Sequence, residues 1–199
     1  MRGISLLLCL AVLQAEACPE PSGREAATPP VCIRTPDMPE QLRMDHYRGP
    51  TPVCVPNAVT LDIPGLQALL AQSPSTVLID VWAILLRQEE GFPSVWLPNE
   101  AHYSLPGAVW LPNVGYGELK PDLEAYLRSN LQRLTAGNKD HPLVFFCVAD
   151  CWMSWNTVQR VRDYGYTQVY WFKNGTDGWQ EAGLELVEVE PVPLADREE

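Results

Sequence analysis

The chain has 199 residues, of which 46% are hydrophobic, and it contains seven tryptophans. This apolar content excludes a wholly disordered protein, and the length suits one domain of ordinary size with a tail. The formal net charge is −11, and no cluster of lysines and arginines offsets it, which opposes binding to phosphate backbones and anionic lipids. The sequence therefore predicts a globular protein with no nucleic-acid partner.

The N-terminus has the three parts of a secretory signal peptide. Residues 1–2 end in an arginine, residues 4–13 form an apolar run, and residues 15–17 read Ala-Glu-Ala, which is an Ala-x-Ala cleavage signal. About ten apolar residues cannot cross the ~30 Å core of a bilayer, and no later stretch reaches about 18. We expect residues 1–17 to be a signal peptide and the mature protein to be soluble in the periplasm, with no transmembrane segment. Lipoprotein anchoring at Cys18 is less favoured, because a glutamate stands where a lipobox has a small residue.

Removal of the signal peptide leaves an odd number of cysteines in an oxidising compartment. The five are Cys18, Cys32, Cys54, Cys147 and Cys151. At least one thiol must therefore stay free or pair with another molecule. Cys32 and Cys54 lie in a proline-rich stretch and Cys147 and Cys151 in an apolar one, so we expect these two pairs to have different roles.

Residues 18–57 form a proline-rich N-terminal arm. Nine prolines between Pro19 and Asn57 exclude a long helix or a central strand. Cys32 and Cys54 are candidates for a disulfide that would staple this arm. The other interpretation is a disordered tether in which these cysteines are incidental, since sequence alone does not fix connectivity.

From residue 58 the chain alternates between strand-like and helix-like segments. Residues 76–81 form a continuous apolar run, which is typical of a strand buried on both faces. The alternation predicts an α/β domain over residues 58–188, with a mostly parallel sheet flanked by helices, and an acidic tail at residues 189–199. In chain order we expect a short strand from residue 59, a helix over 64–73, strands over 76–81 and 108–110, a helix over 120–135, a strand over 142–147, a helix over 154–164 and a strand over 168–172.

Cys147 ends one of the expected buried strands and precedes a helix. Ligands of such sheets bind beyond the carboxyl ends of the strands, often against a helix N-terminus. Backbone N–H groups of the loop over residues 147–154 can stabilise a thiolate there, which is the setting of a nucleophile. The alternative is that Cys147 is a buried core residue, since free cysteine is among the most buried residue types.

Several segments resemble the rhodanese family, in the same order along the chain. They are Leu-Ile-Asp-Val at 78–81, Ser-Leu-Pro-Gly-Ala-Val at 104–109, Val-Phe-Phe-Cys at 144–147, and a closing segment from Tyr164 that includes Gly178-Trp179 and Gly183. The resemblance covers about residues 58–188. It implies the rhodanese fold, with Cys147 at the position of the reactive sulfur.

The segment from Cys147 to Asn156 is similar to the signature of a narrower group. It resembles the exported rhodanese-like proteins associated with PQQ-dependent alcohol catabolism, the CXXCW-motif proteins, although three residues and not two separate its cysteines. The resemblance implies a periplasmic quinoprotein dehydrogenase or a cytochrome c as partner. PQQ would then belong to the partner enzyme.

Cys151 is the second cysteine of the predicted site. If the loop curls back, Cys151 can resolve an oxidised or persulfidated Cys147 and form an internal disulfide. The alternative is a permanent Cys147–Cys151 disulfide that only rigidifies the loop.

The candidate substrate contacts are Asp150, Trp152, Met153 and Ser154. The loop contains Asp150 and no lysine or arginine, so an anionic donor such as thiosulfate would meet an unpaired carboxylate. We expect little thiosulfate activity unless a cation from elsewhere, such as Arg87 or Lys173, enters the pocket.

Met153 and the two nearby tryptophans bear on which other activities and contacts the loop could have. Met153 stands near the place of the arginine that phosphatase chemistry on this fold needs, so phosphatase activity is disfavoured. Trp152 and Trp155 can form an aromatic rim for a substrate or partner, or they can belong to the core.

No cofactor or metal is expected. The three histidines share no ligand spacing, and neither a dinucleotide fingerprint nor a phosphate-binding Gly-Lys loop is present. Two functions stay open: a sulfur-transfer or thiol-redox protein that uses Cys147 and Cys151, and a catalytically silent module that docks on a dehydrogenase or cytochrome.

Overall fold

The computed structural model describes residues 30–36, 38–89 and 91–194. The expected signal peptide and Cys18 lie outside these residues. Five strands form one parallel sheet in the order β1-β8-β7-β2-β6. This mostly parallel sheet confirms the predicted fold class. The strands are β1 (Val59–Leu61), β2 (Val77–Asp80), β6 (Val109–Trp110), β7 (Leu143–Phe146) and β8 (Val169–Phe172).

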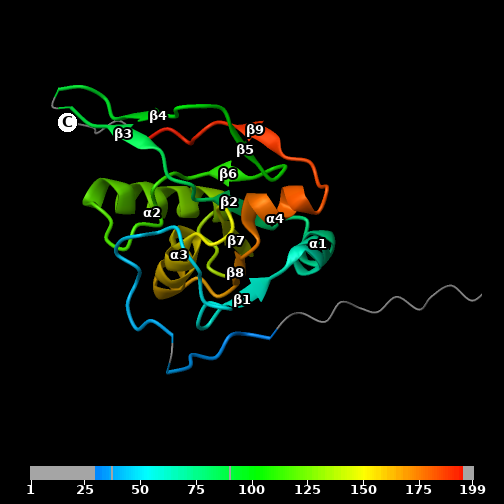
Figure 1. Cartoon of the computed structure of the whole chain (residues 1–199). Helices are drawn as coiled ribbons and strands as arrows, with labels where there is room; N and C mark the ends of the chain where they lie inside the picture. Colours follow the sequence, from blue (N-terminus) through cyan, green and yellow to red (C-terminus); the bar gives the residue numbers. More distant parts are fainter. Residues whose placement is uncertain (1–29, 37, 90, 195–199) are drawn as a thin grey trace, which may run out of the picture.

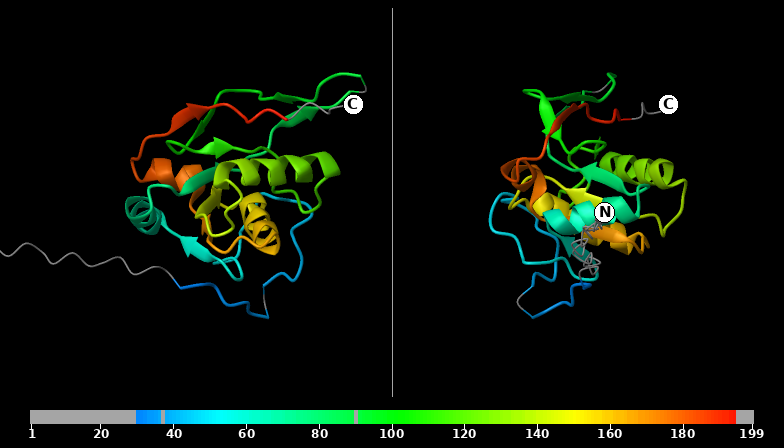
Figure 2. Two further views of the ribbon diagram at one scale, coloured as in Figure 1. Left: turned by 180° about the vertical axis from the view of Figure 1, so that it is seen from behind. Right: turned by 90° about the vertical axis from the view of Figure 1, so that its right-hand side faces the viewer.

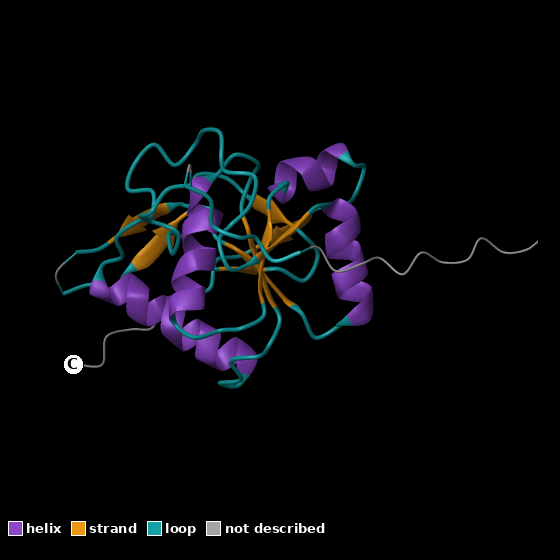
Figure 3. Cartoon of the chain, turned by 90° about the horizontal axis from the view of Figure 1, so that it is seen from below, coloured by secondary structure: helices purple, strands orange, loops and turns teal. Residues whose placement is uncertain are grey.

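Helices cover both faces of this sheet (Figures 1 and 3). In β7, Leu143 and Phe145 point into one hydrophobic cluster, whereas Val144 and Phe146 point into another. Successive side chains of a strand face opposite sides, so the continuous apolar run serves both cores. The first cluster lies under α2 (Pro121–Thr135) and α3 (Trp152–Asp163), and the second under α1 (Ile63–Gln72) and α4 (Gly175–Glu181). None of the described helices combines the length and apolar character needed to cross a membrane.

Local sequence signals fix where the helices begin. The carboxylate of Asp62 accepts a hydrogen bond of 2.8 Å from the backbone N–H of Gly65 and caps α1. Pro64 lies in the first turn of α1 and Pro121 in that of α2, where the missing N–H costs nothing. These caps agree with the predicted helices to within a residue or two.

Two further strand pairs lie along one side of the molecule, beyond β6 (Figures 1 and 2). The antiparallel pairs are β3 (Leu85–Arg87) with β4 (Val95–Leu97), and β5 (His102–Ser104) with β9 (Val187–Val189). The backbone N–H of Val192 donates to the carbonyl oxygen of Trp110, at 2.9 Å. The packed part of the chain therefore extends past residue 188.

The described part of the arm runs past α3 toward the cysteine loop (Figure 1). The sulfur atoms of Cys32 and Cys54 are bonded, with their Cα atoms 5.9 Å apart. The indole N–H of Trp155 donates to the carbonyl oxygen of Cys54, at 3.2 Å. Further back, the amide of Asn156 accepts from the N–H of Arg43 at 2.9 Å and donates to its carbonyl oxygen at 2.8 Å. The arm is thus held against α3 at both ends of residues 43–54.

Candidate active site at the Cys147 loop

Cys147 lies where a central strand of the sheet ends. All four residues of β7 are buried, and β7 lies between β8 and β2. The loop after it leads to Cys151, the N-cap residue of the 12-residue helix α3. Cys147 therefore faces the positive end of a helix at the carboxyl edge of a parallel sheet, where this fold class binds its ligands.

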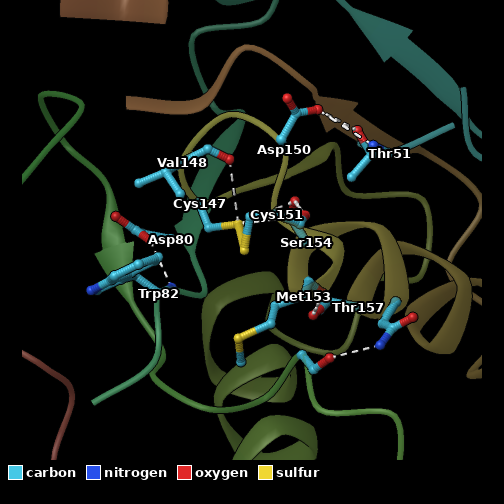
Figure 4. Close-up of a disulfide and its surroundings, with 12 residues drawn as sticks. Thr51, Asp80, Trp82, Cys147, Val148, Asp150, Cys151, Met153, Ser154 and Thr157 are labelled. Atoms are coloured by element: carbon cyan, nitrogen blue, oxygen red, sulfur yellow. Dashed lines mark hydrogen bonds between the residues drawn. A yellow bond between two sulfur atoms is a disulfide. The ribbon is translucent and has the colours of Figure 1, made fainter. Parts of the chain in front are cut away.

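The loop curls so that the two cysteines meet. Their sulfur atoms are bonded (Figure 4), and their Cα atoms are 6.4 Å apart. Asp150 has φ of 50°, a left-handed conformation that aspartate tolerates better than most residues. This turn returns Cys151 onto Cys147. Both are buried, with exposed fractions of 1% for Cys147 and 2% for Cys151.

Ser154 holds a polar position beside the sulfur. Its Oγ lies 3.4 Å from Sγ of Cys147. The same hydroxyl donates to the carbonyl oxygen of Cys151 at 3.2 Å and accepts from the indole N–H of Trp171 at 2.9 Å. With its donor and one acceptor position used, the hydroxyl is fixed in orientation next to Cys147.

Gly175, the first residue of α4, packs against the backbone of the cysteine loop. The N–H of Thr176 donates to the carbonyl oxygen of Cys147 at 2.9 Å. A Cβ atom on Gly175 would lie 2.5 Å from that oxygen and 2.6 Å from the carbonyl carbon of Val148, and Gly175 has φ of +59°. Sequence reasoning missed this contact. Its signal was the Asn174-Gly175 dipeptide one residue after β8, a common turn sequence.

The four candidate substrate contacts have different surroundings. Asp150 is exposed, and its carboxylate turns toward Thr51, whose backbone N–H lies 3.3 Å away (Figure 4). Trp152, Met153 and Ser154 are all buried, and a Cβ on Gly115 would overlap Met153. Ser154 is thus the candidate whose side chain lies beside Cys147.

The two tryptophans of the possible aromatic rim are buried. Trp152 and Trp155 pack edge to face, with their ring centroids 5.2 Å apart, and Trp155 is fully buried. Met153, Trp152 and Trp155 all belong to the core cluster under α3. Their placement is that of core residues.

The arm pairs with the cysteine loop. The N–H of Gly49 donates to the carbonyl oxygen of Asp150 at 3.0 Å, and the N–H of Trp152 donates to that of Tyr47 at 2.8 Å. These two bonds form an antiparallel bridge between Arg48 and Cys151. One of the free N–H groups at the start of α3 is thereby satisfied by the arm.

A buried carboxylate at the end of β2 organises the adjacent surface. Asp80 is fully buried; it accepts from the N–H of Trp82 at 2.9 Å and from the hydroxyl of Ser104 at 2.7 Å, and it lies 2.8 Å from Nε2 of His102. His102 also packs on Trp110, at 4.1 Å between centroids. A cleft of about 530 Å³ opens beside Trp82, His102 and Trp110. The sequence pointed to Asp80 only as a family landmark. Its partners His102 and Ser104 lie on β5, which pairs with β9.

The two cations suggested by the sequence have partners of their own. Arg87 lies on β3, with Nε 4.0 Å from the carboxylate of Glu89. Nζ of Lys173 lies 5.9 Å from the centroid of the Trp171 ring. In the part of the chain that the structure describes, no three His, Cys, Asp or Glu residues cluster as metal ligands would.

Comparisons with known proteins gave one family match and several similar solved structures. The model of the rhodanese-like domain matches residues 64–182, and no curated protein matches the sequence. Among solved structures, the chain is similar to a thiosulfate sulfurtransferase from Pseudomonas aeruginosa, with 22% identity, a TM-score of 0.44, and coverage of 67% of this chain and 21% of that one. It is also similar to a polysulfide-sulfur transferase homodimer from Wolinella succinogenes, with 21% identity, a TM-score of 0.43, and coverage of 66% and 79%. A human single-domain sulfurtransferase has 24% identity, a TM-score of 0.36, and coverage of 61% and 95%.

Proposed function

Since this chain belongs to the rhodanese-like domain family, we propose that it carries out sulfur transfer or thiol redox chemistry with Cys147 as nucleophile and Cys151 as resolving thiol. The observation that carries the proposal is the meeting of these two cysteines at the carboxyl end of β7 and the N-terminus of α3. A strand-end sulfur at a helix N-terminus is placed to react as a thiolate.

With a sulfur donor and a dithiol reductant, the two cysteines allow a balanced reaction. The Cys147 thiolate attacks the outer sulfur of a donor, the bond from that sulfur to the rest of the donor breaks, and the leaving group departs with the electron pair. Cys147 then carries a persulfide. The Cys151 thiolate attacks Sγ of Cys147, which releases hydrosulfide and forms the Cys147–Cys151 disulfide. A dithiol reductant must supply two electrons to return both cysteines to thiols.

The surroundings of Cys147 favour its charged form. The N-terminus of α3 offers a partial positive charge to the sulfur. Asp150, the charge that opposes a thiolate, is exposed to water and turned toward Thr51. We therefore expect the pKa of the reduced Cys147 thiol to be lower than that of Cys32 or Cys54.

We place the protein in the periplasm, as an accessory to PQQ-dependent alcohol oxidation with a quinoprotein dehydrogenase or cytochrome c as partner. Support comes from the signal-peptide pattern of residues 1–17 and from the resemblance of the segment that begins at Cys147. N-terminal sequencing of the exported protein tests the location, with a start near Cys18 expected. An intact Met1 in a cytoplasmic fraction would contradict it.

A second function stays possible, because both sulfurs are almost completely buried. In this view the domain is a catalytically silent module, and the disulfide only rigidifies the loop. The two hypotheses differ in what they predict for reduced Cys147: an active thiol reacts quickly with an alkylating probe, and a silent one does not.

Thiol alkylation of the purified mature protein, with and without reductant, decides between them. Peptide mass analysis shows which cysteines are free and how quickly each reacts across a pH series. We expect reduced Cys147 to react faster than Cys32 or Cys54 near neutral pH, and a Cys151→Ser variant to accumulate the Cys147 persulfide when given a sulfur donor. A Cys147 that alkylates no faster than an ordinary thiol would rule out the nucleophile role.

A further inference from the structure

The cysteine loop has one charged side chain of its own, and that charge is negative. Between Cys147 and Ser154 the only ionisable side chain besides the cysteines is Asp150. A sulfur that must become a thiolate, and attack donors whose leaving groups depart as anions, gains from a cation nearby. The arm that crosses the loop carries one, at Arg48.

Arg48 lies directly opposite Cys151. The two hydrogen bonds that flank the pair run from Gly49 to Asp150 and from Trp152 to Tyr47. This pattern defines a non-hydrogen-bonded antiparallel pair, whose Cα atoms are about 4.5 Å apart and whose side chains leave on the same side. The side chain of Arg48 therefore leaves the bridge on the side to which Cys151 directs its sulfur.

The far end of the Arg48 side chain is also located. Its guanidinium carbon lies 5.6 Å from the centroid of the Trp82 ring. Trp82 follows Val81, whose N–H donates to the carbonyl oxygen of Phe146 at 2.9 Å, and Phe146 directly precedes Cys147. The side chain of Arg48 thus reaches from Cys151 to Trp82. Because Asp80 pairs with Phe146, Val81 is level with Cys147, and Trp82 is the next residue along the chain.

In the part of the chain that the structure describes, the charge of Arg48 has no acidic partner. Among the described residues, no carboxylate lies within ion-pair distance of its guanidinium. The nearest acidic side chain along the loop, Asp150, instead accepts from the backbone N–H and hydroxyl of Thr51, at 3.3 and 3.5 Å. Arg48 is exposed, and the one interaction that its guanidinium makes within the described ranges is with the indole face of Trp82, which leaves its donors available to an anion.

We propose that Arg48 of the N-terminal arm is the anion-binding residue of the Cys147 site. It attracts sulfur donors and leaving groups that carry negative charge, and it stabilises the Cys147 thiolate. This role rests on the proposed function of Cys147. It supplies from the arm the cation that the loop lacks, and it offsets the repulsion between an anionic donor and Asp150.

The test is charge-selective alkylation of the reduced, full-length mature protein. Iodoacetate carries a negative charge and iodoacetamide is neutral, so the ratio of their rates at Cys147 reports the local potential, while any change in access affects both probes alike. Arg48→Gln removes the charge and Arg48→Lys keeps it. Arg43→Gln is the matched control, because Arg43 also lies in the arm over an indole, that of Trp152 at 5.3 Å, but has Asp45 beside it.

We expect Arg48→Gln to lower the iodoacetate-to-iodoacetamide ratio about fivefold, the upper end for an exposed charge pair. Arg48→Lys and Arg43→Gln should stay close to wild type. If Arg48→Gln does not fold, the wild-type ratio should still fall as salt is added. An unchanged ratio in Arg48→Gln, or a salt-independent wild-type ratio, overturns the role of Arg48. If wild-type Cys147 reacts slowly with both probes, the proposed function itself fails.

Discussion

Gly175 offers a direct test of how the site is supported. Replacing it with alanine would place a Cβ atom 2.5 Å from the carbonyl oxygen of Cys147 and 2.6 Å from the carbonyl carbon of Val148. Both atoms belong to the backbone of the cysteine loop, so no flexible side chain can move aside. Gly175 also has φ of +59°, a conformation that is unfavourable for alanine. Either Gly175 or the cysteine loop must shift.

The two costs can be separated with a second glycine. Gly183 has φ of +75°, but a Cβ atom there would have nothing within 4 Å. Gly183→Ala should therefore lower the free energy of unfolding by the backbone term alone, about 1–2 kcal/mol. Gly175→Ala adds the steric term of an overpacked site, about 1–3 kcal/mol. We expect Gly175→Ala to cost about 2–5 kcal/mol and to exceed the control by at least 1 kcal/mol.

Urea unfolding followed by tryptophan fluorescence measures both variants, since seven tryptophans report on the fold. The same samples, reduced and alkylated, give the reactivity of Cys147. We expect Gly175→Ala to change this reactivity and Gly183→Ala to leave it unchanged. Equal free energies of unfolding for the two variants, with an unaltered Cys147, would refute the claim that Gly175 supports the loop.

Four further outcomes follow from the structure. Asp80→Ala leaves three hydrogen-bonding partners of a buried carboxylate unpaired, and it should cost about 3–5 kcal/mol in urea unfolding, with Asp80→Asn less damaging. Replacing Cys32 and Cys54 by serine removes a disulfide that links positions 22 residues apart, and the free energy of unfolding should fall by on the order of 3 kcal/mol. Because the arm is then loosened, mass analysis should also show faster reduction of the Cys147–Cys151 disulfide. Burial raises the pKa of Tyr126 above its usual 10.0. The neutral phenol therefore stabilises the folded state fully below pH 10, and this stabilisation is lost as the pH rises above 10. The melting temperature should fall above pH 10, and less steeply in Tyr126→Phe. Asp150→Arg should raise thiosulfate:cyanide transfer several-fold and not by orders of magnitude, because the carboxylate is exposed; an unchanged rate would mean that loop charge does not limit this reaction.

The main elements could be predicted because their sequence patterns are local. The apolar run at β7 and the leucine spacing of α2 need no knowledge of neighbours, and both lie within a residue or two of the expected bounds. The strands β3, β4, β5 and β9 were missed. All four are three residues long; β3 and β4 pair with each other, and β5 pairs with β9 far along the chain. Strands this short depend on their partners for stability more than on a local sequence pattern.

For the site, the sequence by itself determined where the sulfur of Cys147 stands. A cysteine after a buried strand and before a helix reaches the carboxyl edge of a parallel sheet, because strands that alternate with helices run parallel and end at the same edge. A second cysteine four residues on, with a residue that tolerates a left-handed turn before it, allowed the loop to close. Both features depend only on residues that are close together in the sequence.

Only the tertiary structure decided what surrounds that sulfur. Arg48 reaches the loop through an antiparallel bridge between segments about one hundred residues apart in the chain, and Gly175 reaches it through the packing of α4. Asp150 turns toward Thr51 for the same reason: the arm offers it hydrogen-bond donors. Such contacts depend on which distant segments pack together, and the residue pattern of one segment does not determine which segments pack against it.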